Sequence, residues 1–119
     1  MENQESVEVF THQIERRFVK SFLDMLILRS VEAEPTWGYD IIKETESTYK
    51  VKLRHGALYP MLNTLEAKGF VKSRKELQKG RMRKIYEITL RGKQVLHAYY
   101  DSLREQLPQE QHTGGKKSK

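Results

Sequence analysis

The chain has 119 residues, a formal net charge of +6 and no cysteine. This length predicts one domain with a modest core, and the missing cysteines exclude a disulfide framework and a thiolate metal site. The longest apolar run covers only residues 25–28 and the first twenty residues contain no signal-peptide core, so we expect neither membrane insertion nor secretion.

The N-terminal region predicts two amphipathic helices. The first is expected over about 5–17, because apolar residues recur there at spacings of three, four and four residues. These residues are Val7, Phe10, Ile14 and Phe18. Their apolar face has no apparent partner nearby in the sequence. A second helix is predicted over about 18–33, before Pro35. The pattern leaves open whether the two helices form one kinked helix.

A third helix is predicted over about 38–48, directly after Trp37. Asp40 and Glu44 lie in or near its first turns, where acidic charge complements the helix dipole. In residues 49–53, apolar residues then alternate with lysines. This alternation predicts a short strand, which we expect to pair as a third strand with the hairpin described below.

A fourth helix is predicted over about 55–68. Its apolar face has the spacing i, i+4, i+7: Leu58, Leu62 and Leu65. Gly69 follows where a left-handed C′ residue belongs, and Phe70 is placed to contact Leu65. Pro60 is expected to make the first turn irregular. The outward face carries Gly56, Tyr59 and Asn63.

A basic hairpin follows Gly69. Its strands are predicted over about 70–76 and 83–89, with Gly80 supplying the positive φ that a tight turn requires. Residues 68–93 contain ten basic and two acidic residues, a local charge of +8, whereas the rest of the chain carries −2. Positive charge beside an exposed helix is typical of nucleic-acid binding. A lysine-protected edge hairpin would also be basic.

The last helix begins after Thr89, a suitable N-cap, and ends before Pro108. Its apolar residues recur at spacings of four, three and four, which is typical of a coiled-coil seam: Leu96, Tyr100, Leu103 and Leu107. Residues 108–119 are expected to be a disordered tail. The predicted fold is mainly α with a small β-hairpin wing, a winged helix-turn-helix with N- and C-terminal dimerisation helices.

Five segments carry a resemblance to a known family: FLDMLIL (22–28), WGYDI (37–41), GALYPML (56–62), LEAKGFV (65–71) and YEITLRG (86–92). Over about 18–96 the chain resembles the PadR-like transcriptional regulators. The resemblance implies a homodimeric repressor that dimerises through its terminal helices, in a short subtype with one helix after the wing. The family often begins the recognition helix with Ser or Thr, whereas this chain has Arg54 and His55, which add donors for phosphate.

The predicted organisation is a dimerisation helix in 1–17, a DNA-binding domain in 18–91, a dimerisation helix in 92–107 and the tail in 108–119. The predicted dimerisation residues are Val7, Phe10, Ile14, Leu96, Tyr99, Tyr100, Leu103 and Leu107. The predicted DNA-binding residues are Tyr39, Arg54, His55, Gly56, Tyr59, Pro60, Asn63, Lys79, Arg81, Arg83 and Lys84.

The recognition helix, about 55–68, is expected in the major groove, with Asn63 in a bidentate pair with adenine. Tyr59 is expected at a phosphate or a thymine methyl group, and the alternative is that it packs on the hairpin. Cations of the wing, about 72–86, are expected on phosphates or in the minor groove: Lys79, Arg81 and Arg83. The resemblance also allows a small-molecule effector near Trp37, Tyr99 and Tyr100, whose alternative role is packing.

No catalytic, cofactor or metal site is predicted. The four histidines are scattered without metal-ligand spacing, and residues 114–118 lack the spacing of a phosphate loop. Three functions stay open at this point: a dimeric sequence-specific repressor of double-stranded DNA, an architectural DNA-binding protein, or a protein-interaction module. The first two imply a cytoplasmic, nucleoid-associated prokaryotic protein with no membrane partner.

Overall fold

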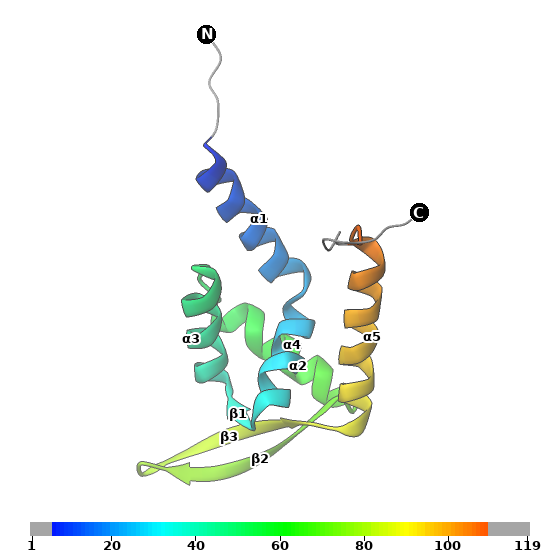
Figure 1. Ribbon diagram of the computed structural model, residues 1–119. Coiled ribbons are helices and arrows are strands. Elements are labelled where there is room, and N and C mark those ends of the chain that lie inside the picture. The colour runs from blue at the N-terminus through cyan, green and yellow to red at the C-terminus, as the bar shows by residue number, and fades with distance from the viewer. Residues whose placement is uncertain (1–5, 110–119) are drawn as a thin grey trace.

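The computed structural model describes residues 6–109. The elements, in order, are α1 (Val7–Ser21), α2 (Leu23–Ala33), β1 (Thr36–Trp37), α3 (Gly38–Tyr49), α4 (His55–Ala67), β2 (Val71–Gln78), β3 (Arg81–Ile88) and α5 (Leu90–Gln106). Figure 1 shows α2 between α3 and α5, with the hairpin beneath the helices. The fold is therefore mainly α with a small antiparallel sheet, as predicted. The predicted start of the first helix at residue 5 and most of the predicted tail, residues 110–119, lie outside the described residues.

α1 and α2 are two helices separated by one residue, Phe22, whose φ of −117° and ψ of 30° are not helical. The hydrogen bonds nevertheless continue through the break, since the Phe22 N–H donates to the Phe18 carbonyl over 2.9 Å. Ser6 caps α1 by accepting a hydrogen bond from the Val9 N–H. The N-terminal half of α1 extends away from the rest of the molecule (Figure 1).

The sheet contains three strands in the order β1-β3-β2. The prediction that residues 49–53 supply the third strand is wrong, because β1 pairs with β3 instead, through Thr36 with Tyr86 and Trp37 with Ile85. Lys50 ends α3 in a left-handed conformation. The alternating pattern has another cause: Val51 and Leu53 point into the core from an extended loop and are only 8% and 5% exposed.

The strands of the wing, defined as residues 71–88, run two residues further toward the turn than predicted. β2 and β3 stay in register out to Gln78 opposite Arg81. Lys79 and Gly80 form the two-residue turn, and both have positive φ, 51° and 77°. Two positive φ values identify a turn whose twist matches the strands, so the predicted role of Gly80 is confirmed. The tip projects beyond the helices, and α5 stands at the opposite end of the hairpin (Figure 1).

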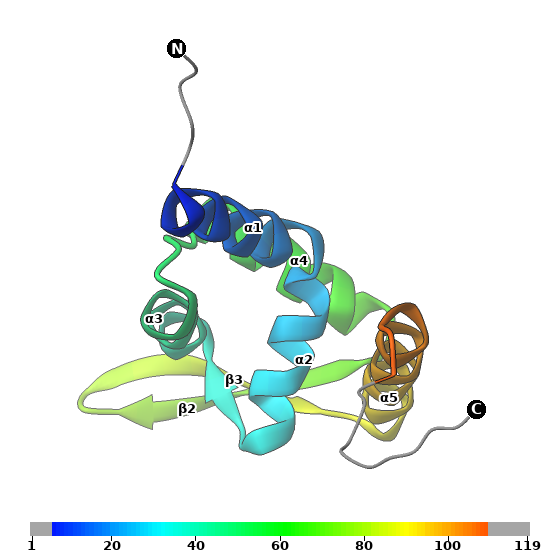
Figure 2. The same cartoon turned by 45° about the horizontal axis from the view of Figure 1, so that its top comes forward.

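α2 provides the centre of the core. Ile27 and Leu28 are fully buried, and α2 lies between α3 and α5 in a second view as well (Figure 2). The predicted apolar face of α4 is also buried: Leu58, Leu62 and Leu65. At the start of α5, Leu96 is fully buried in the same core. Burial of these side chains is the main stabilising contribution to this arrangement.

The end of α4 and the start of α5 form one joined unit. The Phe70 N–H donates to the Leu65 carbonyl over 2.9 Å and the Gly69 N–H to the Glu66 carbonyl over 3.0 Å, with Gly69 at a φ of 81°. These bonds define a Schellman motif, and the predicted left-handed conformation of Gly69 is confirmed. The Thr89 hydroxyl donates to the Gly69 carbonyl over 2.6 Å and accepts from the Gly92 N–H over 3.1 Å. The recognition helix and the C-terminal helix are thus fixed to each other.

Candidate nucleic-acid interface

A groove of about 730 Å³ separates the outer face of α4 from the wing. We call it the wing groove. Its lining residues come from β1, the start of α3, α4 and β3: Trp37, Gly38, Tyr39, His55, Tyr59, Asn63, Arg81, Met82, Arg83, Lys84 and Tyr86. Seven of the predicted DNA-binding residues therefore lie together. Arg54 and Gly56 line a different groove, whereas Pro60 lies on the exposed side of α4 and Lys79 in the turn of the wing.

Trp37 is the platform on which a wing arginine rests. The Arg83 guanidinium carbon lies 3.5 Å from the centre of the Trp37 ring, a cation–π contact. The indole Nε1 donates a hydrogen bond to Asp40 Oδ2 over 2.5 Å, which orients the ring. The sequence alone predicts for Trp37 only a ligand-binding or packing role. The sequence shows that Trp37 directly precedes the helix that contains Asp40, but it does not show that Trp37 pairs with β3.

Tyr59 packs closely on the start of α3. A Cβ atom at Gly38 would overlap the Tyr59 hydroxyl and ring, so the glycine makes this close approach possible. The His55 ring stacks on Tyr59 with centres 5.6 Å apart and an angle of 18° between the planes. Tyr59 stays 37% exposed. Its hydroxyl edge is held in place by the protein while the remaining surface faces the groove.

Glu66 connects α4 to both strands of the wing. Its Oε2 accepts a hydrogen bond from the Ser73 hydroxyl over 2.6 Å, and its Oε1 lies 3.6 Å from Lys84 Nζ. Lys84 is therefore already in an ion pair, whereas residues 6–109 contain no ion pair of the wing cations Lys79, Arg81 and Arg83. Next to it, burial raises the pKa of the Tyr86 hydroxyl, and the Lys84 charge opposes part of this rise. These contacts fix the angle between the recognition helix and the wing.

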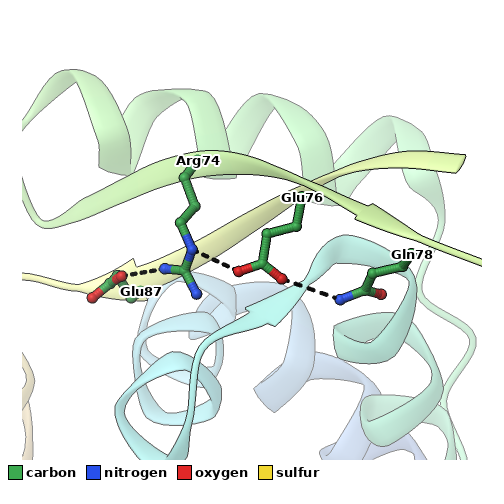
Figure 3. Close-up of polar contacts among 4 residues, drawn as sticks. All are labelled: Arg74, Glu76, Gln78 and Glu87. Atoms are coloured by element: carbon green, nitrogen blue, oxygen red, sulfur yellow. Dashed lines mark hydrogen bonds and ion pairs between the residues drawn. The ribbon is translucent and has the colours of Figure 1, made fainter.

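The acidic residues of the basic segment both neutralise one arginine. Arg74 Nε donates to Glu76 Oε2 over 2.7 Å, and Arg74 also pairs with Glu87 across the hairpin (Figure 3). The hydrogen bond to Glu76, the largest contribution, raises the pKa of Arg74. Gln78 continues the network by donating to Glu76 Oε1 over 3.4 Å. No carboxylate of residues 68–93 is then left to pair with Arg81 or Lys79.

The prediction of an irregular first turn at α4 is wrong. The helix runs without a break from His55 to Ala67, with Pro60 inside it. The Arg54 carbonyl accepts from both the Ala57 and the Leu58 N–H groups, each over 3.0 Å. A proline at this position removes only one backbone donor, and the exposed side of the helix allows water to replace that bond. The helix therefore tolerates Pro60.

The predicted dimerisation residues divide into an exposed and a buried group. On α1, Val7, Phe10 and Ile14 are 80%, 48% and 44% exposed. Leu107, the residue that follows the last turn of α5, is exposed. Three residues of α5 are half-buried against the core: Tyr99, Tyr100 and Leu103. Leu96 differs, because its side chain lies inside the core of its own chain. It is therefore unavailable to a seam between two chains.

Tyr99 joins α5 to α2. Its hydroxyl donates a hydrogen bond to Asp24 Oδ2 over 2.5 Å. Burial, followed by this hydrogen bond, raises the pKa of Tyr99 to about 12. Since the raised value belongs to the folded state, the interaction stabilises the fold below the ordinary tyrosine pKa and is lost as the pH rises through about 12. Tyr99 therefore has a defined packing role within the chain.

Neither a metal cluster nor a membrane span is found in residues 6–109. No three His, Asp or Glu side chains of this part of the chain converge on a position that would suit a metal ion. Likewise, none of the helices described combines the length and the apolar character needed to cross a bilayer.

The comparisons with known proteins agree on one family. Residues 27–98 match the model of the transcriptional regulator PadR-like family. The chain belongs to this family. It is 30% identical over 104 residues to the transcriptional regulator Rv3488 of Mycobacterium tuberculosis, covering 84% of this chain and 96% of the relative.

Solved structures of transcriptional regulators share the fold. A PadR family regulator from Clostridium difficile matches with a TM-score of 0.66 and 29% identity, covering 71% of this chain and 88% of the other. The regulator TA0346 of Thermoplasma acidophilum matches with a TM-score of 0.68 and 27% identity, covering 76% and 87%. This PadR-like protein is thus a DNA-binding transcriptional regulator of the winged-helix type, and its family is not one of enzymes.

Proposed function

We propose that this PadR-like regulator is a homodimeric, sequence-specific repressor. In this proposal α4 enters the major groove of double-stranded DNA and the wing contacts the backbone or the minor groove. The observation that carries it is the wing groove, in which the outer face of α4 and the wing cations line one continuous surface. A dimer bound across a promoter excludes polymerase by occupancy alone, so repression is the proposed outcome.

The residues of the wing groove fall into two proposed groups, those that recognise bases and those that contact the DNA backbone. Asn63 is exposed on α4, and its amide suits a bidentate pair with adenine. Arg81 is exposed on the wing without a carboxylate partner in the hairpin, so it is assigned to phosphate. Arg83 is held over Trp37 and Lys84 is held by Glu66, so these two cations are placed before DNA arrives. Such preorganisation reduces the entropy lost on binding.

The uncovered faces of the terminal helices support the proposed homodimer. Val7, Phe10 and Ile14 form an apolar stripe on α1 that the rest of the described chain leaves exposed. Leu103 and Leu107 extend the apolar surface along α5. A second copy would cover both stripes through a two-fold interface. Two recognition helices would then address half-sites about 34–36 Å apart.

Sequence specificity is tested with two variants and DNA selected from a random pool. We expect Asn63→Ala to lose about 1–3 kcal/mol on the selected operator and little on random DNA. Arg81→Ala should weaken both DNAs alike and lower the salt slope by about 0.9 for each phosphate that the protein no longer neutralises. Lys93→Ala, an exposed cation on α5, is the matched control. Binding is measured by fluorescence anisotropy at several salt concentrations.

Two results would contradict this assignment. Equal losses on both DNAs for Asn63→Ala would place that residue on the backbone. A wild-type protein that prefers no sequence over random DNA would instead be an architectural DNA-binding protein.

The dimer is tested at Phe10. A charge at Phe10 would be buried in the interface without a partner, so Phe10→Asp should sediment as a monomer. Because Phe10 is 48% exposed within the chain, the variant should retain its fold. Phe10→Leu keeps the position apolar and should remain dimeric. Analytical ultracentrifugation and circular dichroism check both variants, and a dimeric, folded Phe10→Asp protein would exclude α1 from the interface.

A further inference from the structure

A second groove, of about 780 Å³, lies against the first turn of α4. We call it the α1 groove. Residues from the end of α1, the start of α2, the loop before α4 and α4 itself line it: Arg16, Val19, Lys20, Leu23, Val51, Lys52, Leu53, Arg54, Gly56 and Ala57. We propose that the α1 groove binds the DNA backbone on the side of α4 away from the wing. This inference rests on the proposed function.

The first turn of α4 is the ridge between the two grooves. His55 lines the wing groove, whereas Gly56 and Ala57 line the α1 groove. An α-helix is about 10–12 Å in diameter, and the major groove of B-DNA is about 12 Å wide. A helix that enters it therefore has a phosphate strand on each flank. The wing reaches one strand, and the α1 groove faces the other.

The charges of the α1 groove suit a polyanion. No acidic side chain of residues 6–109 lines the groove. Four of its ten lining residues are basic: Arg16, Lys20, Lys52 and Arg54. All four are exposed, and within the described residues none of them forms an ion pair. Like charges at close range oppose folding. A polyanion bound in the groove would offset the repulsion among these four exposed cations.

The floor of the groove explains how these cations are held. Val19, Leu23 and Leu53 are buried beneath the rim. Lysine and arginine stems pack on such apolar surface while their charged ends stay in water. Since the rim charges come from two segments 32 residues or more apart, α1 and the loop at 51–54, only the folded chain brings them together. Arg16 and Lys20 also precede residues 27–98, the part matched by the family model.

The test compares two double variants of the full chain. Arg16→Ala with Lys20→Ala removes the α1 side of the groove, and Lys93→Ala with Arg104→Ala removes the same charge from exposed positions on α5. We expect the first pair to weaken binding to operator and random DNA alike by tenfold or more. Its salt slope should fall by about 0.9 for each phosphate left without its cation. The second pair should keep the slope of the wild type.

Sedimentation and thermal unfolding check whether both double variants keep the assembly and fold of the wild type. If Arg81→Ala weakens DNA binding while the Arg16/Lys20 pair behaves as its control, the α1 groove is not a DNA contact and the proposed function still stands. If the wild type binds no DNA, the proposed function itself fails. Inorganic phosphate provides the third arm: if it stabilises the wild type but not the Arg16/Lys20 variant, and DNA affinity is unchanged, the groove is a site for free anions and the inference is overturned.

Discussion

The two ends of α4 are built in opposite ways. At the C-terminal end, Gly69 and Phe70 close the helix with backbone hydrogen bonds, and Thr89 and Gly92 bind that ending to α5. At the N-terminal end, Arg54 makes no capping hydrogen bond through its side chain. The first-turn residues there are exposed and border two basic grooves.

This difference separates the residues that hold the recognition helix from those that are free to contact DNA. An end without a side-chain cap leaves backbone donors and a partial positive charge facing outward, and both favour a phosphate. An end that is capped and packed fixes the helix axis relative to α5. Because α5 also presents a proposed dimer surface, the orientation of one recognition helix relative to the other depends on the capped end.

Gly92→Ala should have the largest effect on this comparison. A Cβ atom there would overlap the Phe70 carbonyl oxygen, which is backbone and cannot turn away. We expect a loss of about 3 kcal/mol in the free energy of unfolding, at the upper end of typical overpacking costs. Urea denaturation followed by circular dichroism measures it. A variant as stable as the wild type would show that α5 is not tightly joined to the end of α4.

Thr89→Ala should have an intermediate effect. It removes the N-cap of α5 and the hydrogen bond to the Gly69 carbonyl, so we expect a loss of about 1–2 kcal/mol in the free energy of unfolding. Thr89→Ser keeps the hydroxyl and is the matched control. Equal stability of the two variants would mean that the hydroxyl does not hold the joined unit together.

The capped end was predictable from the sequence because its signals are local. Gly69, Phe70 and Leu65 lie within six residues of one another, and the required geometry follows from backbone chemistry. The hairpin turn at Gly80 was predictable for the same reason.

Features that depend on contacts between distant segments were not predictable in this way. The alternation of Val51 and Leu53 with lysines is typical of a strand. A loop that buries every second side chain produces the same pattern. Leu96 fits the spacing of a coiled-coil seam, but its side chain is buried in the core of its own chain. The contact of Trp37 with Arg83 and the α1 groove both require the tertiary fold. Charge counting located the basic hairpin and missed the second basic surface, because its residues are spread over the sequence.

Gly56→Ala, at the exposed end of α4, should have the smallest effect on the free energy of unfolding. It should stabilise the fold, whereas Gly92→Ala and Thr89→Ala should destabilise it. A Cβ atom there has no other atom within 4 Å, so the free protein accommodates it. Alanine restricts the unfolded chain and should raise the free energy of unfolding by about 0.4–1 kcal/mol. Thermal unfolding would detect this as a higher midpoint.

The same substitution should weaken operator binding several-fold, because the methyl group takes up the space into which a phosphate or a base edge fits. A variant that is more stable but binds the operator more weakly is expected where a glycine is needed for DNA contact and not for the fold. Gly92→Ala provides the contrast, since its defect appears in the free protein. A Gly56→Ala protein with wild-type operator affinity would show that the first turn of α4 stays clear of DNA, and a less stable one would show that this end helps to hold the fold.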